Sequence, residues 1–159
     1  MKIIYLFLTI LSINLMHSQE TTTIYLIRHA EKAGGSTDPD LSEAGKARAN
    51  RWAEWLADKS IAAIYSTPYK RTQQTAQPLA QMLNQQAITY NPSEVGLKAM
   101  AAKHKGQSIV IVGHSNTIPL YVNRLLGKDH YPDIDESECG NIFIITFENE
   151  RVSHELRKI

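Results

Sequence analysis

The sequence predicts an α/β fold, a three-layer α/β/α sandwich around a mainly parallel sheet. Apolar runs rich in β-branched residues alternate along the chain with amphipathic stretches, a pattern typical of a parallel sheet covered by helices on both faces. Two of these runs end in a histidine, LIRH at 26–29 and IVGH at 111–114. Ligands of open α/β sheets bind at the carboxyl edge of the strands, so both histidines are expected at one binding edge.

The first elements follow from local signals. Residues 21–27 are rich in β-branched residues and predict a strand. Residues 31–40 contain glycine, serine and proline and predict a loop. A helix is expected from Ser42, a good N-cap, to about Asp58, with its tryptophans as core residues rather than a ligand platform.

The middle of the chain predicts two further strands and two helices. Residues 61–65 predict a buried strand, and Thr67 and Pro68 after it are typical of an N-cap and first helical position. Pro78 lacks a backbone donor, so we expect a kink or break in that helix. Residues 87–90 predict a short strand, and residues 93–105 a helix capped by Ser93.

The last third completes the predicted sheet. A strand at 108–112 leads to His114, and a helix is expected from Asn116 as N-cap to Leu126, before Gly127. Residues 141–148 and 151–156 alternate between apolar and polar residues, with a hairpin turn at Asn149 and Glu150. These strands close the sheet at one side.

Composition predicts one exported domain. Residues 1–19 combine Lys2, a short apolar stretch and polar residues, which is typical of a secretory signal peptide; an uncleaved anchor and a first strand are the alternatives. The chain is long enough for a single further domain, 20–159, which we expect to be periplasmic or secreted. Without Lys2 the 16 basic residues balance the 16 acidic ones (17 − 1 = 16), which argues against nucleic acid or stable membrane association. Cys139 has no intrachain partner for a disulfide and is expected to be a half-buried packing residue.

The residues at the predicted edge suit a phosphate group. Arg28 and Arg71 both follow strands, and a guanidinium donates two parallel hydrogen bonds to a phosphate. The helix starts expected at Thr67 and Asn116 add free N–H donors for an anion. A phosphate site formed by Arg28, Arg71, His114 and Asn116 is therefore expected.

The two histidines have distinct expected roles. A neutral His29 could attack phosphorus and form a phosphohistidine if one ring nitrogen is free and the other is held, for example by a carbonyl of its own loop. His114 could donate to the charge that develops on the phosphoryl oxygens. His104, His130 and His154 lie among charged or turn residues and are expected at the surface.

Three motifs in order support this interpretation. RHAE at 28–31, YSTP at 65–68 with Arg71 and QTA at 74–76, and GHS at 113–115 resemble the signatures of the histidine phosphatase superfamily, the phosphoglycerate mutase-like fold. LSEAG at 41–45 resembles the stretch that opens its first long helix, so the match covers nearly all of residues 23–147. The resemblance implies His29 as nucleophile, Arg28, Arg71 and His114 as its phosphate pocket, and no metal or cofactor.

The chain departs from the mutases of that family. Only 38 residues separate Thr75 from His114, which leaves a minimal lid and resembles the compact branch of bacterial phosphohistidine and periplasmic sugar-phosphate phosphatases. The general acid is open: Glu94 after a predicted turn is the first candidate, and Glu31, which could instead hold an arginine, is the second. With phosphohistidine as substrate, no strong acid is needed.

Four readings of function remain. The first is an exported phosphatase acting on small phosphorylated substrates or a phosphoprotein. The second is a mutase-type phosphotransferase, which needs a lid that excludes water. The third is a phosphate- or phosphoprotein-binding module without turnover. The fourth is a metallohydrolase, which the adjacent Arg28 and Arg71 disfavour because they repel a divalent cation. The physiological substrate and the oligomeric state stay undetermined.

Overall fold

The computed structural model describes residues 20–159, so the predicted signal peptide lies outside the described residues. One six-stranded sheet has the order β3-β2-β4-β1-β5-β6. Its strands are β1 (Thr21–Arg28), β2 (Ile61–Ser66), β3 (Ile88–Thr89), β4 (Ser108–Gly113), β5 (Asn141–Glu148) and β6 (Arg151–Lys158). The first four run parallel, and β5 and β6 pair antiparallel. The predicted mainly parallel sheet is confirmed.

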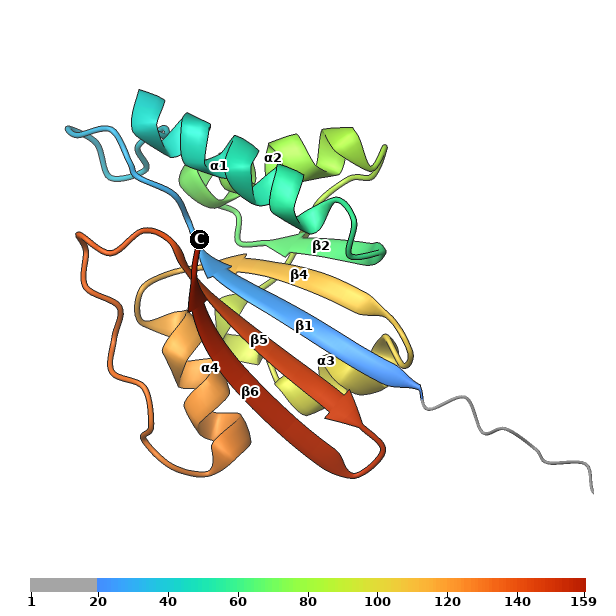
Figure 1. Cartoon of the computed structure of the whole chain (residues 1–159). Helices are drawn as coiled ribbons and strands as arrows, with labels where there is room; N and C mark the ends of the chain where they lie inside the picture. The colour runs from blue at the N-terminus through green and yellow to red at the C-terminus, as the bar shows by residue number, and fades with distance from the viewer. Residues whose placement is uncertain (1–19) are drawn as a thin grey trace, which may run out of the picture.

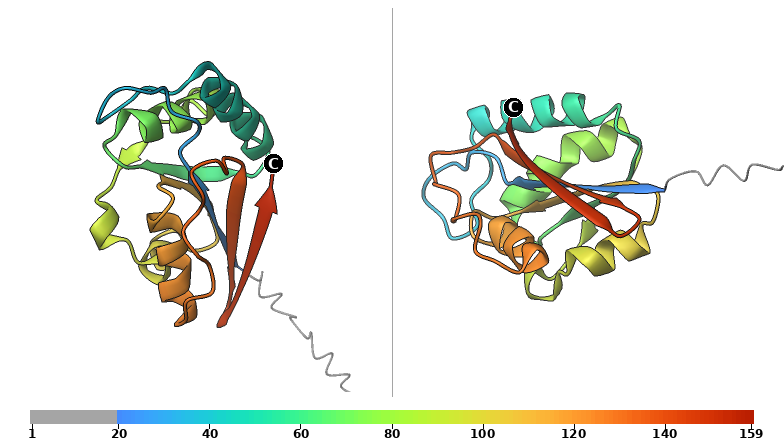
Figure 2. Two further views of the ribbon diagram at one scale, coloured as in Figure 1. Left: turned by 90° about the vertical axis from the view of Figure 1, so that its left-hand side faces the viewer. Right: turned by 60° about the horizontal axis from the view of Figure 1, so that its bottom comes forward.

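Helices cover both faces of the sheet (Figure 1). On one face lie α1 (Glu43–Leu56) and α2 (Lys70–Met82), which pack against each other; on the other lie α3 (Leu97–Lys103) and α4 (Thr117–Leu126). The two side views show the sheet between these layers (Figure 2). A separate apolar core fills the space on each side, with Trp52 in one and Tyr121 in the other. The predicted three-layer sandwich is therefore confirmed.

The central strands β1 and β4 carry uninterrupted buried runs in their middle because both of their faces are covered. Ile24 and Leu26 of β1 and Ile109 and Ile111 of β4 are completely buried. The outermost strand β6 is exposed at most positions and alternates instead. β6 follows the predicted hairpin at Asn149, which adopts a positive φ of 55°.

The structure corrects the predicted start of the second helix. Thr67 and Pro68 do not cap α2; its N-cap position is Tyr69, and Asp38 accepts a hydrogen bond from the Lys70 N–H at 3.0 Å. Thr67 instead directs its hydroxyl across the sheet edge, as described below. The helix also continues through Pro78 without the expected break.

Two further predictions are corrected in detail. The helix expected at 93–105 is split into a 3₁₀ turn at Pro92–Glu94, with Asn91 accepting from the Ser93 N–H, and the shorter α3. Asn116 holds the N-cap position of α4 as expected, but its side chain makes no capping hydrogen bond. Ser42 caps α1 as predicted and accepts from the Gly45 N–H.

Histidines expected at the surface are not all exposed. His130 is exposed, whereas His104 and His154 are half-buried. His104 contacts the Tyr65 hydroxyl and His154 the Tyr131 hydroxyl, each at 2.8 Å. No helix within residues 20–159 is long and apolar enough to cross a membrane.

Candidate active site

The ends of β1 and β4 bring the two histidines together. The strands pair in parallel with Arg28 opposite Gly113, so the next residue of each strand is at the same edge. The His29 N–H donates to the Gly113 carbonyl at 2.9 Å. The two imidazole rings are 5.6 Å apart between centroids. Residues 85 positions apart in the sequence thus face one another.

Gly113 leaves room for side chains that pack against the end of β4. A Cβ at this position would lie 2.7 Å from Ile118 Cδ1 and 3.0 Å from the Tyr90 hydroxyl. A side chain here would therefore force the side chains of Ile118 and Tyr90 to shift. The glycine in the GHS motif thus allows His114 to sit directly beside the first turn of α4.

His29 has one ring nitrogen held and one free among the contacts of residues 20–159. Its Nδ1 is 2.8 Å from the carbonyl oxygen of Ala30, so Nδ1 carries the proton and donates. Burial lowers the pKa of His29 to about 4, against the opposing effect of the Ala30 hydrogen bond, and Arg28 and Arg71 lower it further. The neutral ring therefore presents an unprotonated Nε2, the form that a nucleophile needs.

His114 contacts two side chains from the second motif. Its Nε2 is 3.0 Å from the Thr67 hydroxyl, and its Nδ1 is 3.4 Å from Nη2 of Arg71. Burial lowers the pKa of His114 to about 4, with further lowering by Arg71, His29 and Arg28. His114 is thus also neutral at physiological pH, and a neutral imidazole can donate from only one nitrogen.

Arg28 is embedded in the fold. Its side chain is 3% exposed, and Nη1 lies 3.0 to 3.2 Å from the carbonyl oxygens of Asp135, Glu136 and Glu138. Nη2 pairs with the Glu136 carboxylate at 3.0 Å, and Lys32 contacts the same oxygen at 3.2 Å. The Nε–H is buried and has no acceptor within the described part of the chain. Arg28 therefore joins the end of β1 to the loop before β5.

Arg71 is held more loosely. Its guanidinium is 3.4 Å from the Asp38 carboxylate and stacks over the Tyr69 ring at 4.5 Å. Its side chain is 16% exposed, five times the fraction of Arg28. These contacts leave Arg71 facing His114 with N–H donors that the protein does not fully occupy.

Thr75 connects the His29 loop to α2. Its hydroxyl donates to the Arg71 carbonyl at 2.7 Å and accepts from the Ala30 N–H at 3.0 Å. Because Thr75 is buried, this pair of bonds fixes the loop after β1 against the helix that carries Arg71. The threonine of the second motif therefore has a structural role, which is to join these two segments.

The other expected site residues are not in contact with the histidines. Glu94 is exposed in the turn after β3, at the same edge of the sheet, and accepts from the Asn91 side chain at 2.8 Å. Asn116 is exposed at the start of α4. Glu31 is paired with Arg48 through both carboxylate oxygens, at 2.6 to 2.9 Å. Burial would raise the pKa of Glu31, but Arg48 outweighs it and holds the pKa below its usual range.

Sequence reasoning missed three residues at the site: Thr67 in this role, Asp38 and Glu136. The sequence predicts Thr67 as a helix cap. Its position directly after a predicted strand was the one local indication of a polar side chain at the edge of the sheet. Asp38 and Glu136 lie in loops with no periodic signal. Their contacts with Arg71 and Arg28 span 33 and 108 positions, so no local pattern could have revealed them.

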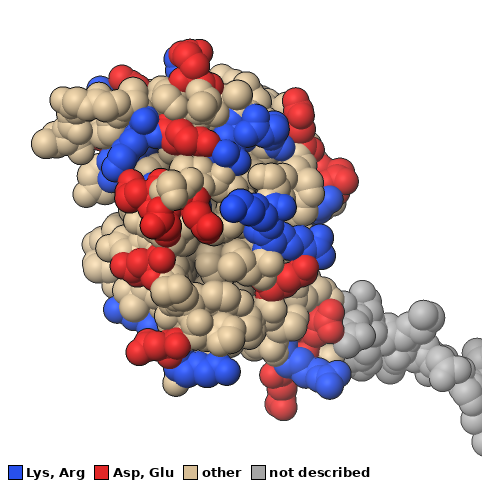
Figure 3. Space-filling view, turned by 60° about the vertical axis from the view of Figure 1, so that its left-hand side comes forward, with Lys and Arg blue, Asp and Glu red and all other residues tan. Residues whose placement is uncertain are grey.

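The surroundings of the site are mixed in charge. The face that carries loops 31–40 and 128–140 shows acidic and basic side chains next to one another rather than a field of one sign (Figure 3). Within residues 20–159 no three His, Cys, Asp or Glu side chains cluster closely enough to hold a metal ion. This face therefore has no broad field of positive charge.

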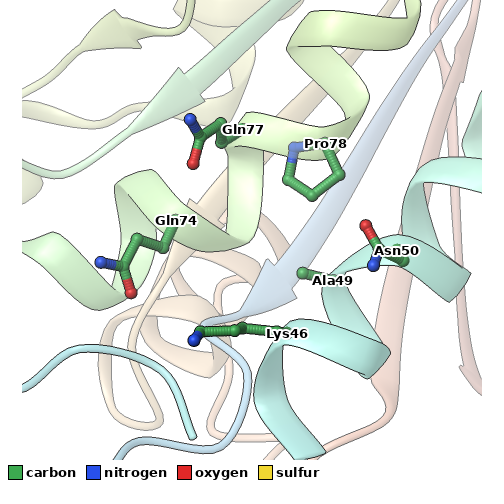
Figure 4. A pocket seen from close by; sticks show the side chains of 6 residues that line it. All are labelled: Lys46, Ala49, Asn50, Gln74, Gln77 and Pro78. Atoms are coloured by element: carbon green, nitrogen blue, oxygen red, sulfur yellow. The ribbon is translucent and has the colours of Figure 1, made fainter. Parts of the chain in front are cut away.

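Two polar hollows flank α2 away from the histidines. One, about 260 Å³, lies between α1 and α2, with Lys46, Ala49 and Asn50 on the α1 side and Gln74, Gln77 and Pro78 on the α2 side (Figure 4). The other, about 450 Å³, lies between α2 and the short edge strand β3 and is lined by Gln73, Gln77 and Gln86 among others. Neither includes His29 or His114 among its lining residues.

Comparison with known proteins finds one family model that matches part of the chain. Residues 24–93 match the sequence model of the histidine phosphatase superfamily (branch 1). Phosphoserine phosphatase 1 of Hydrogenobacter thermophilus is 40% identical over an alignment of 72 residues that covers 41% of this chain. The chain spans about a third (34%) of the length of that curated relative. Residues 24–93, which the family model matches, contain His29 and Arg71, whereas the GHS motif lies beyond them.

Solved structures share the fold. SixA of Agrobacterium tumefaciens, assigned as a phosphohistidine phosphatase, has a TM-score of 0.62 at 22% identity, covering 86% of this chain and 98% of its own. A phosphoserine phosphatase mutant of Entamoeba histolytica, in complex with phosphoserine, has a TM-score of 0.65 at 20% identity, covering 84% and 94%. Phosphoserine phosphatase from the same organism was also solved with 3-phosphoglyceric acid, at a TM-score of 0.65, 19% identity and coverage of 87% and 98%.

Proposed function

We propose, from the match of residues 24–93 to the model of the histidine phosphatase superfamily (branch 1), that this protein hydrolyses phosphomonoesters or phosphohistidine through a phosphohistidine on His29. The observation that carries the proposal is the state of His29: Nδ1 is held by the Ala30 carbonyl at 2.8 Å, and the ring is neutral with its pKa lowered to about 4. A nucleophile with a fixed tautomer beside two arginines suits attack on a phosphoryl group.

The chemistry proceeds in two displacements. The Nε2 lone pair of His29 attacks phosphorus, the bond from phosphorus to the leaving oxygen breaks, and that oxygen takes its electron pair and a proton. Water then attacks the phosphohistidine, the P–N bond breaks, and phosphate leaves. In this proposal Arg28, Arg71 and His114 stabilise the phosphoryl oxygens in both steps.

Two carboxyl groups are candidates for the general acid that gives the leaving oxygen its proton. Glu94 stays the candidate general acid for ester substrates, because it follows β3 at the same sheet edge, and the Tyr90 hydroxyl of that segment donates to the Val112 carbonyl next to the site. Glu31 is the weaker candidate since both its oxygens are paired with Arg48. With phosphohistidine as substrate, the leaving imidazole reduces the need for an acid.

The substrate class in this proposal is a small phosphorylated molecule or a phosphorylated protein segment. Support comes from structural neighbours solved with phosphoserine and with 3-phosphoglyceric acid. Both ligands carry a carboxylate beside the phosphate. We therefore rank small phosphomonoesters that also carry a carboxylate first among the substrates to screen.

The deciding experiment replaces the nucleophile. His29→Ala should lower kcat on an aryl phosphate by about 10³-fold or more while the fold is retained. The wild type quenched in base should carry an acid-labile phosphate that His29→Ala lacks. His130→Ala, at an exposed ring outside the site, is the matched control. Undiminished turnover in His29→Ala would exclude this mechanism, and phosphate binding without turnover in the wild type would favour a non-catalytic binding module.

Export is a separate part of the proposal. The composition of residues 1–19 supports a cleaved signal peptide and a periplasmic or secreted domain. Cell fractionation with N-terminal sequencing of the exported protein tests this. Recovery of the full-length chain in the cytosol alone would contradict export without affecting the proposed chemistry.

A further inference from the structure

The Tyr69 ring contacts two of the groups that the proposed function assigns to the phosphate. The Arg71 guanidinium lies over this ring, with Cζ 4.5 Å from the ring centroid. The His114 imidazole meets the same ring at an angle of 86°, with the two centroids 5.2 Å apart. Both distances are typical of attractive contacts with an aromatic ring. One side chain therefore touches both the arginine of α2 and the second histidine of the site.

Neither helix capping nor core packing explains a tyrosine at this position. Tyr69 occupies the N-cap of α2, where serine, threonine, aspartate and asparagine are favoured because their side chains accept from the first N–H groups. The Tyr69 side chain makes no capping hydrogen bond, and the Asp38 carboxylate accepts from the Lys70 N–H instead. The ring is 41% exposed and belongs to neither apolar core. Its contacts with Arg71 and His114 are what this ring contributes.

The backbone at the start of α2 directs the ring toward Arg71. Residues two positions apart inside a helix do not face each other. Tyr69 lies just outside the helix, with an extended φ of −86° and ψ of 143°, so its ring can turn toward the side chain of Arg71. Its carbonyl accepts from the N–H groups of Thr72 and Gln73, at 3.1 and 3.0 Å, and from the Thr72 hydroxyl, at 2.8 Å. These bonds fix the backbone that carries the ring.

Stacking holds a guanidinium without using its N–H donors. An ion pair occupies donors in the plane of the group, whereas an aromatic ring contacts its face. The polar contacts of the Arg71 guanidinium, with Asp38 Oδ1 and His114 Nδ1, are both long at 3.4 Å. The Tyr69 ring thus limits where the guanidinium lies and leaves its donors available to a ligand. Because a stacking contact tolerates small sideways shifts, Arg71 can still adjust to that ligand.

We infer that Tyr69 is a positioning residue whose ring holds the Arg71 guanidinium beside His114 and so keeps its N–H donors available to the phosphoryl group. The ring carries this role, and the hydroxyl does not. The inference rests on the proposed phosphatase function, because it assigns how one of the phosphate-binding arginines is prepared for that reaction.

Substitutions at Tyr69 separate the ring from the hydroxyl. Tyr69→Leu keeps an apolar side chain and removes the ring; kcat/KM on an aryl phosphate should fall about 3- to 30-fold, the range expected for loss of one cation–π contact. Tyr69→Phe keeps the ring and should retain kcat/KM within about twofold. The matched control is Lys59→Met, which removes another cation–π contact, 4.9 Å from the Trp55 ring centroid and before the start of β2, at the opposite edge of the sheet. It should leave kcat/KM unchanged.

A double-mutant cycle with Arg71→Ala tests whether the ring acts through the guanidinium. In the Arg71→Ala background, Tyr69→Leu should lower kcat/KM by less than about twofold. The affinity for inorganic phosphate should follow the same pattern, with a loss of about 3- to 30-fold only while Arg71 is present. An equal loss in both backgrounds would mean that the ring contacts the leaving group or supports the fold, and would overturn the inference.

A spectroscopic measurement detects the stacking without turnover. A proton above an aromatic ring resonates upfield. In ¹⁵N-arginine-labelled protein the Arg71 Nε–H, assigned by its loss in Arg71→Ala, should therefore lie upfield of the exposed Arg151 in the wild type and in Tyr69→Phe. An unshifted Arg71 signal in the wild type, or full kcat/KM in a folded Tyr69→Leu, would overturn the inference. A shifted signal with phosphate binding but no turnover in the wild type would instead refute the proposed function.

Discussion

The two arginines at the site carry the same charge to the same edge but are held in opposite ways. Arg28 is 3% exposed and surrounded by three backbone carbonyls and the Glu136 carboxylate. Arg71 is 16% exposed and has one carboxylate contact, at 3.4 Å. The first guanidinium is part of the packing between β1 and the 135–139 loop, whereas the second is free to reorganise around a ligand.

The sequence predicts one role, phosphate binding, for both arginines, whereas their contacts and burial indicate different contributions to folding. A buried cation that satisfies several carbonyls stabilises the folded chain, because those acceptors lose water on burial. A partly exposed cation with a long ion pair adds little to stability. Arg28 should therefore affect both folding and catalysis, and Arg71 catalysis alone.

The largest effect is expected from Arg28→Ala. The change removes the donor that the carbonyls of Glu136 and Glu138 share with that of Asp135, which keeps only the Glu138 N–H, so the free energy of unfolding should fall by about 3 kcal/mol. Activity should fall at least about 10²-fold, since a phosphate ligand is lost as well. Urea denaturation and steady-state kinetics measure the two losses. A stable but inactive variant would mean that the contacts with the 135–139 loop contribute little.

Arg71→Ala should lower kcat/KM on an aryl phosphate by about 10²- to 10³-fold through lost stabilisation of the phosphoryl charge. The midpoint of thermal unfolding should stay within a few degrees, because the Arg71 guanidinium makes long polar contacts with Asp38 and His114 and stacks on the partly exposed Tyr69 ring. Arg151→Ala on the exposed hairpin is the control for loss of an arginine. A destabilisation as large as that of Arg28→Ala would contradict the contrast drawn above.

The imidazoles at the two strand ends predict an acid-shifted pH profile. Both have a pKa lowered to about 4, first by burial, so both stay neutral well below pH 6.5. kcat/KM should be constant from pH 7 to pH 5.5 and fall about fourfold by pH 4 as the two rings become protonated. A fall centred at pH 6.5 would show that the rings titrate as if exposed.

The same shifts predict how stability depends on pH. Between about pH 4 and 6.5 the unfolded chain binds more protons at these histidines than the folded one does. The free energy of unfolding should therefore decrease as the pH falls through this range. In the double variant His29→Ala with His114→Ala this part of the slope should be lost.

The smallest effect is expected from Glu136→Gln. The carboxylate is 63% exposed, so the free energy of unfolding should change by less than about 1 kcal/mol. Removing a negative charge beside Arg28 should lower KM for an anionic substrate about two- to fivefold. Lys32→Gln, which removes the other partner of this carboxylate, should move KM the opposite way. A loss of stability close to that of Arg28→Ala would show that the ion pair, and not the carbonyls, holds Arg28.

Much of the fold was predictable because its signals are local. The strands at the end of which Arg28 and His114 lie are buried on both faces, and this burial leaves a continuous apolar run in the sequence. The hairpin at Asn149 and the cap at Ser42 likewise depend on neighbouring residues alone. A histidine directly after each of two buried strands was therefore enough to expect a shared site.

Local signals were insufficient where a residue serves a distant partner. Thr67 and Pro68 have the composition of a helix start, yet the buried Thr67 hydroxyl bonds to His114, 47 positions away. The Arg28 contacts with the 135–139 loop span 107 to 110 positions. The residues next to Glu94 and Asn116 in the sequence likewise do not indicate whether either side chain contacts the histidines.

The amino-acid sequence by itself determined where most strands and helices form and which two histidines follow the central strands. The spacing of apolar residues indicates which side chains are buried, and capping residues indicate where helices begin and end. Only the tertiary structure decided which arginine is packed and which is free, and which nitrogen of each histidine faces the site. Those properties depend on side chains brought together by the strand order β2-β4-β1-β5, and no short stretch of sequence contains that order.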